Sequence, residues 1–164
     1  MPHGRFRQHP VFQLYAERWL ESLIVADPKR LDPDLCRRPL YSQVPAYAGR
    51  RRVIDLVGVT ETGRLAVIEV KVQKTMDLLF QGLSYWQNVR QALHDDAFSK
   101  NGYFAETALD RDPPLLFCVT PLLSLHPEAR HLAVHLRPEV EAYLIGINNN
   151  WREGIQVLRK ERLR

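Results

Sequence analysis

Apolar residues between Phe12 and Ile24 recur three or four positions apart, at Phe12, Tyr15, Ala16, Trp19, Leu20, Leu23 and Ile24. This spacing predicts an amphipathic helix with one buried side. Trp19 lies on the apolar side, so it is predicted to be a core residue. Asp27 and Pro28 end the helix. The following passage is rich in proline, which leaves room for only a short edge strand near residues 40–44.

Two runs rich in β-branched residues come next, at 52–59 (RVIDLVGV) and 64–72 (RLAVIEVKV). The segment Thr60-Glu61-Thr62-Gly63 joins them, so they are predicted to form a β-hairpin. The second run has apolar residues on both faces, which is typical of a strand in the centre of a sheet.

The rest of the chain alternates between helical and extended patterns. A helix is expected over residues 76–93, with Trp86 on its core stripe, and residues 98–112 read as a loop. A buried strand over 114–120 precedes a helix that opens at Pro127 and closes near Arg137 and Pro138. Strands at 142–147 and 154–159, with Asn148-Asn149-Asn150 between them, end the chain.

This order predicts an α/β fold, a mixed central β-sheet flanked by helices on both sides. The 164 residues, 45% hydrophobic and 26% charged, indicate one soluble domain over residues 1–164. No stretch approaches the ~18 apolar residues of a membrane span, and no signal-like segment opens the chain. We therefore expect a cytoplasmic protein without a membrane partner. Its two cysteines, Cys36 and Cys118, are expected to be reduced.

The formal net charge of +4 is distributed unevenly. Residues 1–8, 29–52 and 151–164 carry an excess of basic side chains, and the remainder of the chain is acidic. The basic segments could form a footprint for a polyanion if the fold brings them together, or they could be solvated loop residues.

Charged residues interrupt the apolar runs of the predicted central hairpin. Glu69 and Lys71 leave the same face of a strand that is otherwise apolar, where charges are costly unless they are paired or bind something. Asp55 lies on the preceding strand at matching depth. A two-residue loop would put it opposite Val70, whereas a three-residue loop would put it opposite Glu69. Gly63 suits the left-handed position of a three-residue loop, which we therefore predict.

Two carboxylates that face each other across a ladder repel unless a cation neutralises them. Oxygen ligands of this kind suit Mg²⁺ or Mn²⁺. The predicted register therefore points to a metal ion between Asp55 and Glu69.

Asp55, the hairpin, Glu69-Val70-Lys71 and the helix after it resemble the core of the PD-(D/E)xK nuclease superfamily. The resemblance covers roughly residues 9–120 and implies a restriction-endonuclease-like αβββαβ core, followed here by a helix and a β-hairpin. It implies that Asp55 and Glu69 bind metal with the Val70 carbonyl, and that Lys71 positions the attacking water and the scissile phosphate. Ile54 stands where the name of the motif has proline.

Further matches to this superfamily lie on the two main helices. Gln81 and Tyr85 are one turn apart and resemble the Gln-xxx-Tyr element of RecB-like members, where the glutamine approaches the site and the tyrosine supports the substrate strand. They can also be read as a surface glutamine and a half-buried tyrosine. The superfamily often supplies another acid from its first helix. Glu17 lies nearer the apolar stripe than Glu21 and is the better candidate, although it can equally be a solvated glutamate.

The leading hypothesis is a Mg²⁺-dependent nuclease that hydrolyses phosphodiester bonds in nucleic acid, with DNA favoured although the sequence does not distinguish DNA from RNA, and with Arg50, Arg51 and Arg52 on the nucleic-acid backbone. One alternative is an inactive nuclease-fold module that binds nucleic acid or a protein. Another is a structural ion pair in an unrelated domain, which would leave Asp55 and Glu69 on opposite faces of the sheet. Many members of the superfamily are dimers, so a homodimer is compatible with the resemblance.

Overall fold

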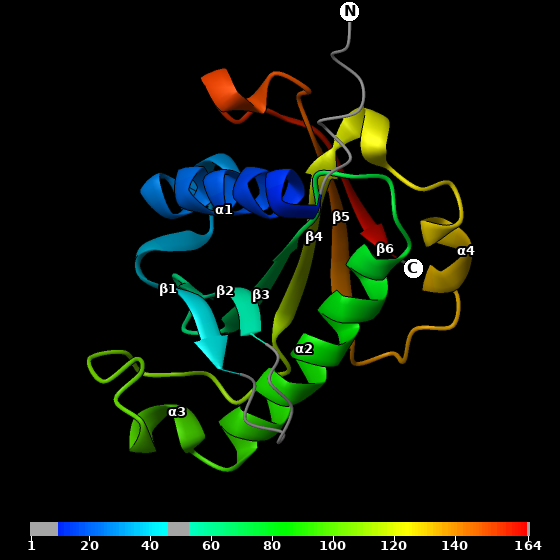
Figure 1. The fold of residues 1–164 in the computed structure, drawn as a ribbon. Coiled ribbons are helices and arrows are strands. Elements are labelled where there is room, and N and C mark those ends of the chain that lie inside the picture. Colours follow the sequence, from blue (N-terminus) through cyan, green and yellow to red (C-terminus); the bar gives the residue numbers. More distant parts are fainter. Residues whose placement is uncertain (1–9, 46–52, 164) are drawn as a thin grey trace, which may run out of the picture.

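The computed structural model describes residues 10–45 and 53–163, apart from the side chains of residues 10–14. Six strands form one mixed sheet in the order in which they occur in the chain, β1-β2-β3-β4-β5-β6 (Figure 1). The strands are β1 (Leu35–Pro45), β2 (Val53–Thr60), β3 (Leu65–Val70), β4 (Leu115–Pro121), β5 (Glu141–Ile147) and β6 (Val157–Leu163). The helices are α1 (Pro10–Ala26), α2 (Asp77–His94), α3 (Ala97–Lys100) and α4 (Ala129–Ala133), with single 3-10 turns at Pro28–Arg30, Leu122–Ser124 and Trp151–Glu153. The predicted α/β fold is confirmed.

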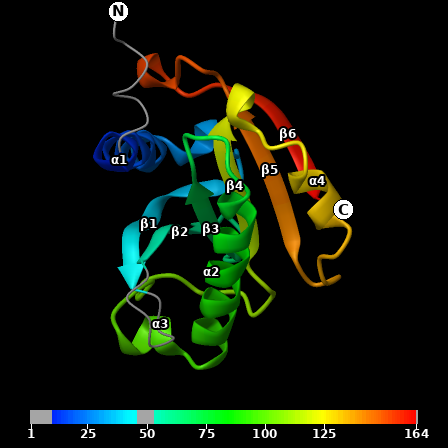
Figure 2. The same cartoon turned by 45° about the vertical axis from the view of Figure 1, so that its right-hand side comes forward.

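The central strands β3, β4 and β5 run parallel, and the outer pairs are antiparallel. Helix α2 makes the crossover from β3 to β4. Two apolar layers cover the sheet, one on each face. Leu20 and Ile24 of α1 pack in one layer with Ile68 of β3. Trp86 of α2 packs in the other with Val67. Figure 2 shows α1 end-on beside the sheet and α2 in front of it.

The hairpin between β2 and β3 has the predicted three-residue loop. The Thr60 N–H donates to the Arg64 carbonyl at 2.9 Å, and Gly63 has φ of +86°. A Cβ at Gly63 would lie 2.4 Å from the Ala108 carbonyl oxygen, so both conformation and space require glycine here. Leu56 pairs with Ile68, and the same register puts Asp55 opposite Glu69.

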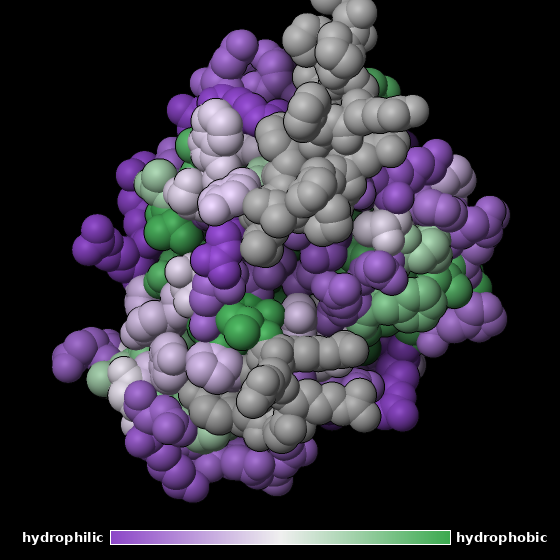
Figure 3. Space-filling view, viewed as in Figure 1, coloured by the Kyte–Doolittle hydropathy of each residue, from purple (hydrophilic) through white to green (hydrophobic). Residues whose placement is uncertain are grey.

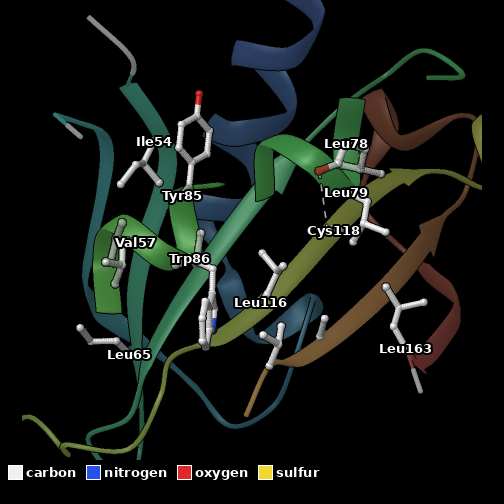
Figure 4. Packing of buried hydrophobic residues seen from close by; sticks show 14 of the residues in the cluster. Ile54, Val57, Leu65, Leu78, Leu79, Tyr85, Trp86, Leu116, Cys118 and Leu163 are labelled. Atoms are coloured by element: carbon white, nitrogen blue, oxygen red, sulfur yellow. Dashed lines mark hydrogen bonds between the residues drawn. The ribbon is translucent and has the colours of Figure 1, made fainter. Parts of the chain in front are cut away.

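Helix α2 packs closely on β4 because Gly82 faces the sheet. A Cβ there would lie 3.1 Å from Leu116 and 3.2 Å from Cys118 Sγ. One turn further along, Trp86 is 2% exposed, as predicted, and its Nε1–H donates to the Pro114 carbonyl at 2.6 Å. Figure 4 shows Trp86 among the buried side chains between α2 and the sheet. This packing fixes how α2 lies over β3 and β4.

Several predicted elements have different bounds. β1 is longer than the expected short edge strand and contains irregular pairing between Leu35 and Leu40. The region expected to be a loop contains the short helix α3. Helix α4 ends at Ala133, because the chain turns after it instead of continuing to Arg137, and β6 begins at Val157 instead of residue 154.

The prediction that Trp19 is a core residue was wrong. Its side chain is 48% exposed and lies edge-on to Trp151, with 6.0 Å between ring centroids. Arg152 places its guanidinium over both rings, 5.6 Å and 4.4 Å from their centroids. Helical spacing located the apolar side of α1, but it did not show that Ala16, Leu20 and Ile24 fill the contact with the sheet and leave Trp19 at its margin.

Hydrophilic side chains dominate the face seen in Figure 3, where apolar surface occurs only in scattered areas. In the part of the chain that the structure describes, no helix has the length and apolar character required to cross a membrane. Cys36 and Cys118 are both free thiols, and Cys118 is buried beneath α2.

Candidate active site

One face of the hairpin ends in three charged residues. Asp55 lies two positions before Val57 in β2, and Glu69 and Lys71 lie two and four positions after Val67. On that face, Val57 of β2 and Val67 of β3 pack under α2. The apolar residues bury this part of the hairpin completely, and Glu69 is 0% exposed. The three charged side chains therefore come together at the end of a buried face, and the reading that separates Asp55 and Glu69 on opposite faces does not apply.

The Asp55 carboxylate is anchored to the neighbouring strand. Its Oδ2 accepts a hydrogen bond of 3.0 Å from the Val70 N–H. Burial raises the pKa of Asp55 above its ordinary value, although the Val70 N–H and the charge of Lys71 both act in the opposite direction. β3 thus holds one oxygen of this acid in place and leaves the other to a further ligand.

Glu69 is the most deeply buried ionisable side chain of the site. Both of its carboxylate oxygens are buried, and neither accepts a hydrogen bond from any group in the described residues. Burial raises the pKa of Glu69 well above its ordinary value, and the facing Asp55 charge raises it further. A buried carboxylate that accepts no hydrogen bond is costly, and its oxygens have the chemistry of metal ligands.

Lys71 follows β3 directly and supplies the positive charge. Its N–H donates to the Val119 carbonyl at 3.0 Å, so the backbone still follows the parallel ladder. Its Nζ lies 3.5 Å from Glu69 Oε1 and 3.4 Å from Glu17 Oε2. Burial acts to lower the pKa of Lys71, but the surrounding carboxylates, Glu69 foremost, raise it above its ordinary value. The ammonium therefore stays protonated at neutral pH.

Helix α1 brings two acids to this group instead of one. Glu17, the candidate from the sequence, contacts Lys71, and burial raises its pKa. Glu21 is only 6% exposed and accepts a 2.9 Å hydrogen bond from Gln43 Nε2. Burial, followed by the Asp55 charge, raises the pKa of Glu21 to about 7. Both acids therefore belong to the electrostatic environment of the site.

Gln43 is a site residue that the sequence did not indicate. It lies in β1 with φ of +54°, at a position where the edge strand departs from regular geometry. Its Nε2 binds Glu21, and its Oε1 accepts from Arg18 at 3.5 Å. No sequence pattern marks a glutamine in a proline-rich edge strand for such a role.

The two helix residues that resemble a Gln-xxx-Tyr element lie one turn apart on α2. Gln81 is partly buried, and Tyr85 is 7% exposed within the apolar layer under the helix. In Figure 4 the Tyr85 ring lies beside Ile54 of β2. Their role toward a substrate stays a prediction. Arg50, Arg51 and Arg52 lie outside the described residues.

The residues present fit a metal ion that keeps part of its water shell. Within the described ranges, no cluster of three or more His, Cys, Asp or Glu side chains is arranged to hold a metal. The groups that could hold a cation are the Asp55 and Glu69 carboxylates and the Val70 carbonyl. This suits Mg²⁺, which commonly binds proteins through one or two carboxylates and retains several waters. The unbonded oxygens of Glu69 are consistent with this donor set.

Comparison with known proteins gives a match in structure alone. No protein-family model matches the chain, and no curated protein sequence matches it. The fold is similar to the crystal structure of a repair endonuclease from Pyrococcus abyssi, with a TM-score of 0.53 and 20% sequence identity. The similarity covers 78% of this chain and 45% of the endonuclease, so the chain spans less than half of that protein. At this identity the match establishes a shared, endonuclease-like α/β fold.

Proposed function

We propose that this protein is a metal-dependent nuclease of the PD-(D/E)xK type that hydrolyses phosphodiester bonds in DNA. The observation that carries the proposal is the fully buried Glu69 carboxylate. It has no hydrogen-bond donor among the described residues, it faces Asp55, and it lies 3.5 Å from Lys71 Nζ. Such an arrangement costs stability, and a role in binding a cation explains why it is present. The fold shared with a repair endonuclease supports DNA as the substrate.

Asp55, Glu69 and the Val70 carbonyl would hold Mg²⁺ or Mn²⁺. When bound, the metal supplies Lewis acidity toward a phosphate oxygen and favours deprotonation of water. Because Asp55 Oδ2 already accepts the Val70 N–H, its orientation is set before any ligand arrives. A charged group that is already oriented does not have to reorganise during the reaction, so it stabilises the transition state at little cost in free energy.

Lys71 orients the nucleophile and stabilises developing negative charge. Its protonated amine is held between Glu17 and Glu69, about midway between the two acids. With a metal held by Glu69, the Lys71 ammonium would be free to donate to a water or to the phosphate. In this scheme the ion pair with Glu17 keeps the Lys71 amine at the site when the contact between Lys71 and Glu69 weakens.

The remaining proposed roles concern the substrate. Gln81 approaches the site from α2 and Tyr85 supports the substrate strand, as the RecB-like resemblance implies. Arg50, Arg51 and Arg52 bind the phosphate backbone before it reaches Asp55. These arginines and the uneven basic charge of the chain suit a polyanion.

A cleavage assay tests the proposal. Purified protein with Mg²⁺ or Mn²⁺ is incubated with linear, supercoiled, single-stranded and branched DNA, with EDTA as the metal-free control. We expect cleavage of at least one substrate, and a loss of at least about 100-fold for Glu69→Gln and for Lys71→Ala. Glu106→Gln and Lys100→Ala are matched controls because both side chains are exposed and lie elsewhere.

Two results would reject the proposal that this protein is a nuclease. If the wild type cuts none of these substrates, the protein is a nuclease-fold module that binds without cutting. If Glu69→Gln and Lys71→Ala cut as well as the two control variants, the activity lies elsewhere in the preparation or in the chain.

A further inference from the structure

A second candidate site lies on the opposite side of α2. A pocket of about 810 Å³ opens between this helix, the segment that leads into β4 and the segment between α4 and β5. Its volume is in the range of pockets that hold small organic ligands. Seven residues of α2 line it, at Leu83, Trp86, Gln87, Arg90, Gln91, Leu93 and His94.

Helix α2 separates this pocket from the candidate active site. At 100° per residue, Gln81 and Tyr85 point roughly 160–200° away from Leu83, toward the other side of the helix. The pocket also lies along the last turns of α2, whereas Glu69 stands near the start of the helix. A ligand in the pocket therefore does not touch Asp55, Glu69 or Lys71.

The cationic lining gives the pocket its chemistry. Arg90, Arg111 and Arg137 line it from three different segments, together with His94 and His135. No acidic side chain of the described residues is part of the lining. Guanidinium groups contributed by separate segments suit a phosphate group, which accepts paired hydrogen bonds from their planar forks.

Two of the arginines are held in position before a ligand binds. Arg111 donates to the Leu93 carbonyl at 2.9 Å and pairs with Asp96 at 2.7 Å. Arg90 lies 5.3 Å from the centroid of the Trp86 ring and pairs with Glu139 at 3.2 Å. Both ion pairs are exposed at the surface and are weak competitors for a phosphate. The fixed side chains lose little freedom when an anion binds.

The pocket also has an apolar wall. Leu83 of α2 faces it, and Leu136 and Val140 line it from the segment that precedes β5. A free phosphate would leave this wall unused, and an uncharged ring compound would leave the arginines unused. A ligand that combines a flat, largely apolar group with one or more phosphates uses both.

We propose that this pocket binds a nucleoside phosphate, with the phosphates on Arg90, Arg111 and Arg137 and the base against Leu83, Leu136 and Val140. This site is separate from the nuclease site and does not depend on the proposed function. It adds a small-molecule ligand to a chain whose other site acts on a polymer.

Calorimetry with ADP tests the proposal on the full chain, in EDTA so that no metal takes part. We expect one ADP per chain with a Kd of about 1 mM or tighter, and at least about tenfold weaker binding of adenosine and of inorganic phosphate. Arg111→Ala and Arg137→Ala should each weaken ADP binding about tenfold, since each removes charged hydrogen bonds. Arg130→Ala is the matched control, because Arg130 is exposed on α4 and pairs with Glu161 outside the lining.

Glu69→Gln separates this inference from the nuclease. It should retain full ADP affinity even where it abolishes cleavage. Absence of saturable ADP binding, or equal affinity in wild type, Arg111→Ala and Arg137→Ala with unchanged melting temperatures, would overturn the proposal. It would also be overturned if a single-stranded oligonucleotide displaced ADP and lost its own affinity in Arg111→Ala, because the pocket would then be part of a nucleic-acid track.

Discussion

The backbone N–H of Val70 donates a 3.0 Å hydrogen bond to Asp55 Oδ2, which ties this carboxylate to the strand that carries Glu69. Asp55 is thereby oriented by β3, whereas Glu69 has no hydrogen-bond donor among the described residues. The two acids face each other, but only one of them is satisfied by the protein itself. This asymmetry separates what each acid contributes to stability from what it contributes to function.

Asp55→Asn should leave the fold nearly unchanged while it abolishes cleavage. The amide oxygen of asparagine can still accept the Val70 N–H, and a buried negative charge is removed. We expect the free energy of unfolding to change by less than about 1 kcal/mol. Urea denaturation together with the cleavage assay checks this. A loss of several kcal/mol would mean that the Asp55 charge is primarily structural.

Lys71→Met should destabilise the protein, because it removes the ammonium group that pairs with the buried Glu69 carboxylate. Removal of one partner of a buried ion pair costs about 3–5 kcal/mol. The partial exposure of Lys71 (18% of its side chain) makes the lower end of that range the expected value. The double variant Glu69→Gln/Lys71→Met should recover most of the loss, as measured by a double-mutant cycle in urea. Additive effects of the two substitutions would contradict a direct coupling between Lys71 and Glu69.

Gly63→Ala tests the hairpin that brings Asp55 and Glu69 together. An alanine there would need φ of +86° and would place its Cβ 2.4 Å from the Ala108 carbonyl oxygen. Strain in the left-handed region costs about 1–2 kcal/mol, and displacement of the 108 backbone adds to it. We expect a loss of at least about 2 kcal/mol in thermal or urea unfolding. Gly102→Ala is the matched control, since Gly102 also has positive φ but nothing within 4 Å of its added Cβ.

Glu21→Gln should stabilise the protein above neutral pH and have little effect in mild acid. Burial raises the pKa of Glu21 from 4.5 to about 7 in the folded state. The stability associated with the protonated form is therefore present below pH 4.5 and is lost as the pH rises through 7. A glutamine does not ionise, so the variant should exceed the wild type by about 2–3 kcal/mol near pH 8. Urea unfolding of both proteins at about pH 5 and about pH 8 measures the difference. An equal effect at both values would contradict the titration of Glu21.

Much of the fold could be predicted because local chemistry determines it. Gly63 selects the three-residue loop, and that loop sets the register in which Leu56 pairs with Ile68; one further step along it puts Asp55 opposite Glu69. The buried stripe of α2 and the central position of β3, which is apolar apart from Glu69, likewise follow from the spacing of apolar residues. The bounds of β1 and α4 could not be predicted, since irregular pairing and turns that follow a helix depend on contacts made by distant segments.

The surroundings of the charged residues were harder to predict than the residues themselves. A helical wheel gives the relative angles of Glu17, Glu21 and Trp19, but it does not show how far α1 is rotated over the sheet. Leu20 and Ile24 fill the contact, so Trp19 is exposed beside Arg152 and Glu21 is buried against Gln43. These outcomes depend on tertiary packing, which no single segment encodes.

Calorimetric titration of the metal-free protein with Mn²⁺ tests the metal site most directly. The account predicts saturable binding of Mn²⁺ to the wild type and to Glu106→Gln, and loss of that binding in Glu69→Gln and Asp55→Asn at unchanged fold. Absence of Mn²⁺ binding in the wild type, or equal binding in all four proteins, would contradict the claim that Asp55 and Glu69 form a metal site.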